Sequence, residues 1–379
     1  MSDIALDRLD DPAALVEFDP SEMLRAVATS GSQVRASLTA ARETSLTPLS
    51  LDSRPRAIVV TGMGGSGVSG DVLSAVSAAR CPIPIVVHRG YGLPGWVGAA
   101  DLVMAVSCSG TTAETLSAAV EAARRGSRLL GVGTAGSPLD LHCRSESGVF
   151  IPITKQLAPR ASLWALAVPL LVVAERAGLL ELAAAEADLD EAAARLDTVA
   201  SVCGPDRESY TNPAKSLAAE LIGSLPMFWG SGEVGPVAAL RASCQLAENA
   251  KMPALWGALP EAHHNQSVTF DGRLGTGSAE QDLFRDRVDD PETLGLHLVL
   301  VRDDASDEVA KKRAHASADV ARNRGIPVSV IGAEGRSAVE RLASLVGLID
   351  YASVYLGLAQ GVDPTPIAPI DEIKAQLQD

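Results

Sequence analysis

The sequence has little positive charge and few cysteines. Its 32 Lys and Arg residues are outnumbered by 47 Asp and Glu residues, which gives a formal net charge of -15. Nucleic acids and anionic membranes are bound through basic patches that release counterions, so we expect neither as a partner. The five cysteines show no CxxC or CxxH spacing, which fits neither a disulfide framework nor a structural zinc site. We therefore expect reduced, mostly buried thiols.

The sequence also lacks a membrane-spanning stretch and a signal peptide. No window reaches the ~18 uninterrupted apolar residues of a membrane span. The first residues, MSDIALDRLDDPAALVEFDP, are acidic where a signal peptide is basic. We expect a cytoplasmic protein that does not contact membranes. With 379 residues, 47% of them hydrophobic, the chain is long enough for two cores, because single cores stop growing beyond ~250–300 residues.

Continuous apolar runs alternate with helix-forming segments in two parts of the chain, a pattern typical of parallel sheets covered on both faces. The first part predicts strands at 56–62, 83–90, 100–110, 127–134 and 148–153, with helices at 69–80 and 112–126. The second part predicts a strand, glycine loop and helix at 225–251, strands at 294–304 and 326–332, and helices at 308–324 and 337–360. The pattern indicates an α/β fold with two doubly wound parallel sheets of flavodoxin-like topology.

The alternation also predicts how the chain is divided. A helical appendage occupies residues 1–50, with a Gly-Ser break near Gly31, and the first α/β domain occupies 51–160. Linking helices follow at 161–215, and the second α/β domain occupies 216–379. Each domain begins with a strand, a glycine loop and a helix, VVTGMGGSGVSGDVL and MFWGSGEVGPVAAL, which favours a tandem pair of similar domains.

The first of these glycine loops, residues 59–73, is compatible with three kinds of phosphate site. A GxGxxG dinucleotide site needs an acidic residue at the end of the second strand, whereas this strand ends in His88 and Arg89. A nucleoside triphosphate loop needs GxxxxGK[ST], and neither Gly-Lys-Ser nor Gly-Lys-Thr occurs in the chain. The third kind combines hydroxyls, backbone amides and a helix N-terminus, which together bind an anion without lysine.

Hydroxyl-bearing residues follow two of the predicted strands. The first loop supplies Gly65 and Ser66, and the third strand runs into SCSGTT, which supplies Ser107, Ser109, Thr111 and Thr112. Taken singly, each turn is more typical of an ordinary helix cap than of a phosphate site. Because the carboxyl ends of parallel strands meet at one edge of a sheet, beside a topological switch point, the two turns can converge on one phosphate. Together they favour a sugar-phosphate site.

These motifs resemble the sugar isomerase (SIS) domain family, whose phosphate site combines a glycine-serine loop with an SxSGxT turn. Three further stretches are similar to the dual-specificity phosphoglucose and phosphomannose isomerases: PRAS at 159–162, AENAKMPALWGALPEAHHN at 247–265 and GVDPTPIAPIDEIK at 361–374. The resemblance covers residues 55 to 375. It implies two SIS domains, a homodimer with shared active sites, and isomerisation of fructose 6-phosphate to glucose 6-phosphate and mannose 6-phosphate, with no metal and no cofactor.

The resemblance assigns the two acid-base groups of this reaction. Glu248 matches the base that moves a proton between carbons 1 and 2, and a partly desolvated carboxylate suits that task. On its own it is more typical of a solvated helix glutamate paired with Lys251. His264, just before Asn265, matches the histidine that opens the sugar ring, and imidazole titrates in the useful range. In the family this histidine comes from the neighbouring subunit.

Three more residues receive roles from the resemblance. Arg160 matches the arginine that stabilises the negative charge of the enediolate, although a salt bridge at a helix start is the ordinary alternative. Lys374 matches a lysine that contacts the sugar oxygens, and by composition it is an ordinary helix lysine. Thr365 matches a residue that leaves room for both epimers at carbon 2.

The chain departs from the family pattern at two places without losing a catalytic group. Gln266 replaces a frequent acidic residue, and SCSGTT lacks the commoner aromatic and asparagine. Two other functions stay open. A sensor that binds sugar phosphates would not need Glu248, His264 and Lys374 together, and no basic DNA-binding module is visible. An aminotransferring isomerase would add a nucleophile domain, which residues 1–50 do not resemble.

Overall fold

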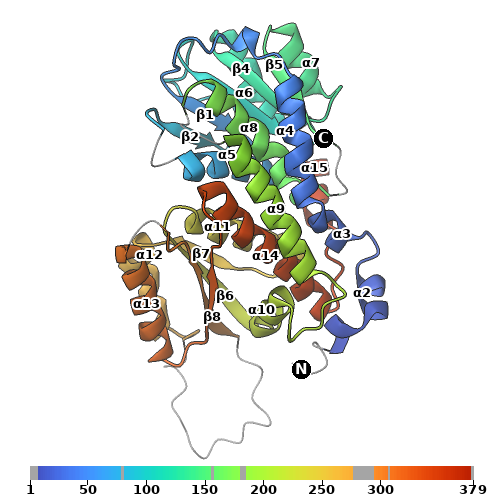
Figure 1. The fold of residues 1–379 in the computed structure, drawn as a ribbon, viewed down its shortest axis with the longest axis vertical. Helices are drawn as coiled ribbons and strands as arrows, with labels where there is room; N and C mark the ends of the chain where they lie inside the picture. The colour runs from blue at the N-terminus through green and yellow to red at the C-terminus, as the bar shows by residue number, and fades with distance from the viewer. Residues whose placement is uncertain are drawn as a thin grey trace, which may run out of the picture. The chain divides into compact units, whose positions relative to one another are not determined.

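The computed structural model describes residues 7–77, 81–154, 158–179, 185–275, 294–305 and 308–376. Contacts divide the chain into two units. The amino-terminal unit comprises Ala28–Thr198 and Glu334–Ser344, and the carboxyl-terminal unit comprises Met1–Val27, Val199–Ala333 and Leu345–Asp379. Figure 1 shows one parallel sheet in each unit. Each unit is therefore described by itself.

The amino-terminal unit is built on a five-stranded parallel sheet in the order β2-β1-β3-β4-β5. Its strands are β1 (Ile58–Thr61), β2 (Ile85–His88), β3 (Leu102–Ser107), β4 (Arg128–Gly133) and β5 (Val149–Pro152). The chain goes from β1 to one side for β2 and returns to the other side of β1 for β3. The topological switch point therefore lies between β1 and β3, the two strands that lead into the hydroxyl-bearing turns.

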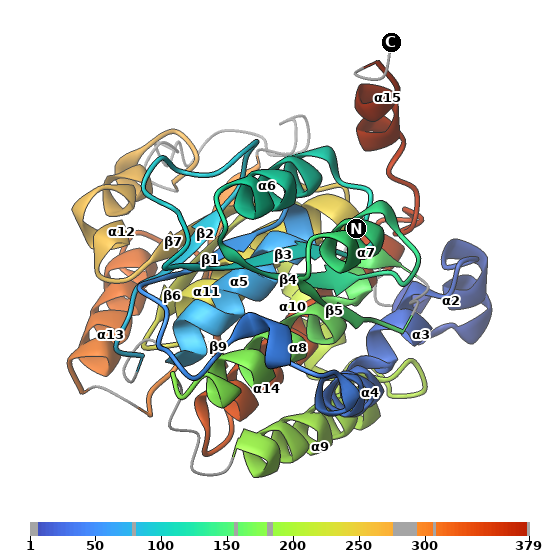
Figure 2. The ribbon, with the colours of Figure 1, turned by 90° about the horizontal axis from the view of Figure 1, so that it is seen from above.

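Helices cover both faces of this sheet (Figure 2). One face packs against α6 (Ala113–Arg124) and α7 (Pro138–Ser145), whose small and apolar side chains share a buried cluster with β3 and β4. The other face packs against α5 (Gly64–Ser77) and α8 (Leu163–Arg176), and α4 (Ser30–Glu43) lies along α8. This unit is thus a three-layer α/β sandwich, as the apolar runs predict.

The break in the N-terminal helical segment lies beside Gly31 rather than at it. Helix α3 (Met23–Ala28) ends before Thr29, and Gly31 lies inside α4. A Cβ atom on Gly31 would lie 2.1 Å from Asp197 Oδ1 on α9 (Ala185–Cys203). The glycine therefore permits the close approach of two helices and does not end one.

The carboxyl-terminal unit is built on a four-stranded parallel sheet in the order β7-β6-β8-β9. Its strands are β6 (Ser224–Ser231), β7 (Leu255–Ala258), β8 (Gly295–Arg302) and β9 (Val328–Gly332). The strand order around β6 repeats the order around β1. Strand β6 lies between β7 and β8, as β1 lies between β2 and β3. The predicted tandem pair of doubly wound sheets is confirmed. Strand β7 was not among the predicted strands.

The two faces of this second sheet carry different helices. Helices α12 (Glu261–His264) and α13 (Glu308–Arg322) share a buried cluster with β6 and β8. The right-handed crossover from β6 to β7 places α11 (Gly235–Asn249) on the opposite face, where it is hydrogen-bonded to α14 (Ala338–Ala359). The remaining helical elements are α2 (Pro12–Phe18), α10 (Pro213–Leu221), α15 (Ala368–Gln376), and the short turns Thr47–Leu49, Pro159–Ala161 and Gln266–Asp271.

The predicted segments 1–50 and 161–215 are each divided between the two units. In the amino-terminal unit, Gln33 of α4 donates to Ala161 O at 2.6 Å, which ties α4 to the start of α8. In the carboxyl-terminal unit, the buried Lys215 ammonium contacts Asp10 Oδ1 at 3.2 Å. Residues 180–184 of the predicted linking helices lie outside the described residues, as do residues 78–80 of the helix predicted at 69–80.

Helix α14 is long and apolar enough to cross a membrane by length and composition. Its 18-residue window has a mean hydropathy of 1.6, and 94% of that window is buried inside the protein. Core helices of this kind pass the same test, so its composition reflects packing on α11.

Candidate functional site

The glycine-serine loop forms the first turn of α5. The helix begins at Gly64, which has φ +51°, so Gly65 and Ser66 belong to the helix rather than to a loop before it. A Cβ atom on Gly62 would lie 3.0 Å from Val106 O, so a side chain there would force β1 and β3 apart. The glycines thus bring a helix N-terminus close to the sheet edge, where its amides favour an anion.

The second hydroxyl-bearing turn joins β3 to α6 and is held by its own side chains. Ser107 Oγ lies 2.8 Å from Thr112 Oγ1 and accepts the Gly110 amide at 3.0 Å. Ser109 Oγ lies 2.9 Å from Thr111 Oγ1. Ser107 is buried, whereas Ser109 and Thr111 are exposed. The turn therefore presents hydroxyls to solvent at the edge of the sheet while its buried serine fixes the backbone.

Hydrogen bonds bring the two turns together, as their positions in the sequence predict. Ser66 Oγ accepts the Cys108 amide at 3.3 Å, and the hydroxyl proton of Ser66 is still able to donate. The short helical turn that contains Arg160 contacts α5, and Ser162 follows this turn. Burial raises the pKa of the Cys108 thiol, and the nearby Ser162 side chain opposes the rise.

Arg160 is 5% exposed, so its guanidinium lies beneath the surface at the start of α8. A buried guanidinium can hold an anionic ligand. Of the residues predicted as a site, the amino-terminal unit brings the first turn of α5 together with the turn that contains Ser107, Ser109, Thr111 and Thr112, and it packs the short helical turn of Arg160 against α5.

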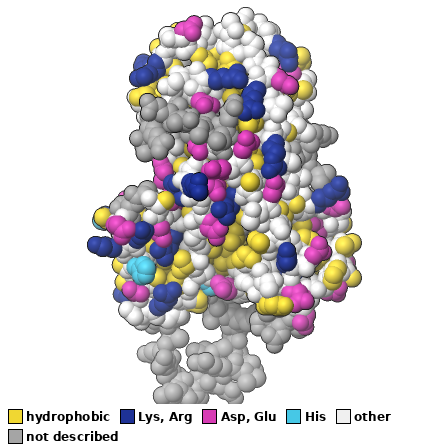
Figure 3. Space-filling view, viewed as in Figure 1, with side chains coloured by type: hydrophobic (Ala, Val, Ile, Leu, Met, Phe, Trp, Pro, Cys, Tyr) yellow, Lys and Arg dark blue, Asp and Glu magenta, His cyan; other side chains and the backbone are white. Residues whose placement is uncertain are grey.

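The end of β2 carries a cation where a dinucleotide site needs an acid. Arg89 forms an ion pair with Asp71 on α5. Burial raises the pKa of Asp71, and the charge of Arg89 opposes the rise. Arg89 Nε would lie 2.9 Å from a Cβ atom on Gly67, so the arginine packs on the first turns of α5. On the face shown in Figure 3, the Lys and Arg side chains of the described residues are mixed with Asp and Glu and form no broad basic patch.

In the carboxyl-terminal unit, the turn between β6 and α11 is equivalent to the turn between β1 and α5. A side chain of the protein itself binds its amides. The Asp303 carboxylate, after β8, accepts the amides of Glu233 and Val234 at 3.2 Å each, directly before α11. Asp303 is fully buried. A carboxylate of the protein itself thus lies at the helix N-terminus of the second unit that is equivalent to the N-terminus of α5 in the first. Sequence reasoning missed Asp303, although it follows β8 as Cys108 follows β3.

Glu248 lies at the carboxyl end of α11 and is half-buried. Lys251, which has φ +55°, donates to Glu248 O at 2.5 Å and to Pro364 O at 3.0 Å. The lysine therefore ties the end of α11 to the segment that follows α14. This segment also contains Thr365, whose amide donates to Asp363 Oδ1 at 2.8 Å. Thr365 and Glu248 thus lie in the same part of the carboxyl-terminal unit.

The two adjacent histidines have different environments. His263 Nε2 lies 2.6 Å from Ser317 Oγ, and its ring packs edge-on against Trp229 at 5.9 Å between centroids. Burial lowers the pKa of His263, and the charges of Arg313 and His264 lower it further. His264 is exposed. Only His264 of the pair is therefore available to a ligand or to another molecule.

Within one chain, Glu248 and His264 are on opposite sides of the second sheet. Helix α11 must run back to the amino edge before β7 can start parallel to β6, so Glu248 lies at that edge. Helix α12 follows the carboxyl end of β7 and packs on the other face. The carboxyl-terminal unit alone does not bring the two residues together.

Lys374 lies on α15, which has no buried residue. The side chains of Ile370 and Ile373 on the same helix are 40% and 61% exposed. Figure 2 shows α15 at the end of an extended segment. The described carboxyl-terminal unit thus leaves the Lys374 ammonium in solvent.

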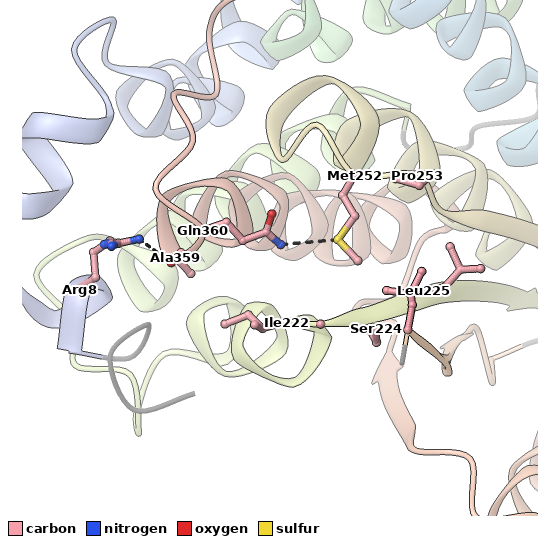
Figure 4. A pocket seen from close by; sticks show the side chains of 10 residues that line it. Arg8, Ile222, Ser224, Leu225, Met252, Pro253, Ala359 and Gln360 are labelled. Carbon is pink, nitrogen blue, oxygen red and sulfur yellow. Dashed lines mark hydrogen bonds between the residues drawn. The ribbon is translucent and has the colours of Figure 1, made fainter. Parts of the chain in front are cut away.

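A cavity of about 570 Å³ in the carboxyl-terminal unit does not match the predicted site (Figure 4). Its walls are largely aliphatic, and Arg8 Nη1 on its rim donates to Ala359 O at 2.8 Å. Gln360 Nε2 lies 3.6 Å from Met252 Sδ. An apolar lining does not suit a phosphate. Among the described residues, no group of three or more His, Cys, Asp and Glu side chains is placed to hold a metal ion.

The two doubly wound sheets and the paired hydroxyl-bearing turns define a tandem SIS-domain protein. A family model described as the bacterial phospho-glucose isomerase C-terminal SIS domain matches residues 210–377. The bifunctional phosphoglucose/phosphomannose isomerase of Caldicellulosiruptor bescii is 32% identical over 324 residues, covering 84% of this chain and 89% of that protein. The chain belongs to the bifunctional phosphoglucose/phosphomannose isomerase family.

Two further proteins are similar to this chain, one in sequence and one in fold. The protein of the same name from Thermoplasma acidophilum is 28% identical over 323 residues, covering 84% of this chain and 89% of that protein. The C-terminal domain of glucosamine-fructose-6-phosphate aminotransferase from Francisella tularensis has a TM-score of 0.67 at 15% identity, covering 91% of this chain and 98% of that chain. That structural likeness shows the fold alone.

Proposed function

We propose that this chain isomerises fructose 6-phosphate to glucose 6-phosphate and mannose 6-phosphate by metal-independent proton transfer through a cis-enediolate. One observation carries the proposal. This chain belongs to the family, and its sequence contains Glu248, His264 and Lys374 together with the hydroxyl-bearing turns. A protein that only binds sugar phosphates has no use for the full set of acid-base groups.

The protein would hold the substrate through its phosphate group. We assign it to the first turn of α5, with Gly65 and Ser66, and to the hydroxyls of the β3–α6 turn. Hydroxyl and amide donors at a helix N-terminus bind a dianion without a lysine. Because Asp303 fills the equivalent position of the second unit, each chain would bind one phosphate, in its first unit.

The chemistry follows from the remaining groups. His264 opens the ring by passing a proton between the ring oxygen and the hydroxyl on carbon 1. Glu248 takes the proton from carbon 2 of the aldose and returns it to carbon 1, while the C–H electron pair moves into the enediolate. Arg160 stabilises the negative charge on the enediolate oxygens, and Lys374 contacts the sugar oxygens.

The active form would be a cytoplasmic homodimer. Glu248 and His264 lie on opposite sides of the sheet in one chain, so His264 of a second copy is needed to complete a site around Glu248. The exposure of His264 and of α15 is compatible with such a shared site.

Turnover in the presence of a chelator tests the proposal. Purified protein is incubated with EDTA and fructose 6-phosphate, and both aldose phosphates are quantified. The proposal expects both products at a rate that the chelator does not change. Binding of fructose 6-phosphate with no turnover would instead identify a sugar-phosphate sensor.

A further inference from the structure

A stripe of buried polar side chains joins α11 to α14 in the carboxyl-terminal unit. Its members are at most 3% exposed, and we call them the polar stripe: Arg241, Gln245 and Asn249 on α11, with Asp350 and Ser353 on α14. On α11 the three positions are four residues apart, so they lie on one side of the helix. Polar groups between two core helices are costly unless each has a partner.

Most of the stripe is paired. Arg241 donates to both carboxylate oxygens of Asp350, from Nε at 3.0 Å and from Nη2 at 2.9 Å. Gln245 Nε2 donates to Asp350 Oδ1 at 2.9 Å, and Asn249 Nδ2 donates to Ser353 Oγ at 2.9 Å. These bonds fix how α11 is rotated against α14.

The carboxamide oxygen of Gln245 is the exception. Gln245 Oε1 is buried and has no hydrogen-bond partner among the residues that the structure describes. Because Nε2 is committed to Asp350, the oxygen is held in one place as an acceptor. A buried acceptor without a partner is destabilising, so its retention calls for an explanation.

Glu248, the residue assigned above to carry the substrate proton, lies one turn after Gln245 on α11. Side chains three residues apart on a helix are neighbours. The charged groups around this end of α11 are Arg241, Lys251, Asp350 and Asp363. Arg241 and Asp350 form a bidentate ion pair, and Lys251 donates to backbone carbonyls.

We propose that Gln245 is a positioning residue for Glu248. After Glu248 has taken the substrate proton it is a carboxylic acid, and this acid donates a hydrogen bond to Gln245 Oε1. The inference rests on the proposed isomerase function. In the first half-reaction the C2–H bond of the aldose breaks, its electrons enter the enediolate, and the proton forms an O–H bond on Glu248. Oε1 then holds that proton away from water until it is delivered to carbon 1.

Deuterium transfer measures this role. Glucose 6-phosphate labelled with deuterium at carbon 2 is converted by wild type and by Gln245→Met, and the deuterium at carbon 1 of fructose 6-phosphate is quantified. We expect the transferred fraction to fall several-fold in Gln245→Met, because the acid exchanges with water. We also expect kcat to fall about tenfold, about 1.4 kcal/mol, with KM within about twofold of wild type.

Ser353→Ala is the matched control, since it removes a buried acceptor from the same stripe without touching Gln245. It should unfold at a lower urea concentration but keep the wild-type deuterium transfer. Gln245→Asn keeps the carboxamide one methylene shorter, and it gives an intermediate loss of transfer if Gln245→Met does not fold.

The outcomes separate this inference from the proposed function. Wild-type deuterium transfer and kcat in a Gln245 variant, with wild-type protein active, would overturn the role of Gln245 alone. A wild-type protein that binds fructose 6-phosphate without turnover would overturn both.

Discussion

Ser66 Oγ accepts the backbone amide of Cys108 at 3.3 Å, and this one bond joins the first turn of α5 to the turn after β3. The two turns lie on either side of the switch point between β1 and β3. Their donors are therefore fixed before a ligand arrives, which lowers the entropy that binding must overcome.

Removing the hydroxyls of this pair should weaken substrate binding. Ser66→Ala and Ser107→Ala each remove a hydroxyl from the phosphate site or its support, so we expect KM for fructose 6-phosphate to rise about tenfold, about 1.4 kcal/mol, in each variant. Ser145→Ala on α7, an exposed serine, is the control. Unchanged KM in both site variants would place the phosphate elsewhere.

Asp303 should matter for stability rather than for phosphate binding. Asp303→Asn removes the charge that faces the amides before α11, and we expect a loss of about 1–2 kcal/mol in the free energy of unfolding. Urea denaturation measures it, with Asp304→Asn, a partly exposed partner of Arg302, as control. A stability loss no larger than that of the control would argue against Asp303 as a built-in anion.

Acid should destabilise the protein through His297. Its Nε2 lies 2.7 Å from Ser329 Oγ, and burial lowers its pKa, while Glu220 acts in the opposite direction. A histidine with a folded pKa below the unfolded value of about 6.5 contributes stability above that pH and loses the contribution as the pH falls below it. We expect His297→Asn to flatten the dependence of the unfolding free energy on pH as the pH falls below about 6.5.

His315, exposed on α13, provides the matched control for that slope. His315→Asn should keep the wild-type dependence on pH. The same slope in wild type and in His297→Asn would mean that other groups cause the acid sensitivity.

Two inactive variants should recover activity when mixed if each active site is shared between two subunits. Glu248→Gln and His264→Asn are each inactive in this account, but a mixed dimer has one site with both native groups. Random mixing makes half of the dimers mixed, so refolding equal amounts together should recover about a quarter of wild-type activity. Activity that stays at the level of the separate variants would mean that His264 does not act across subunits.

The sequence predicted the buried strands better than the exposed edge strand β7 and the helix packing around Gly31. The apolar runs of β1 and β3 are fully buried, which is why they are visible as strands. Strand β7 was missed because it is a short edge strand in which Leu255 and Trp256 are 44% and 42% exposed, so it has no continuous apolar run. The helix break predicted near Gly31 lies at Thr29, whereas the close contact of Gly31 with α9 depends on tertiary packing.

The candidate site was predictable in one unit and not in the other. Ser66 follows β1, and Ser107 ends the adjacent strand β3, so parallel topology alone brings their turns to one edge. The opposite locations of Glu248 and His264 depend on which way the chain crosses after β6, and motif spacing carries no such information. Asp303 and Gln245 were not predicted because their roles arise from partners distant in sequence, Val234 and Asp350.

The most direct test of the account is the activity of Glu248→Gln. The variant keeps the shape of the side chain but cannot accept the proton from carbon 2, and neither hydroxyl-bearing turn is altered. We expect fructose 6-phosphate to bind with the wild-type dissociation constant by calorimetry, and turnover to both aldose phosphates to fall by at least about 10²–10⁴-fold. A Glu248→Gln protein that turns over at the wild-type rate would contradict the account.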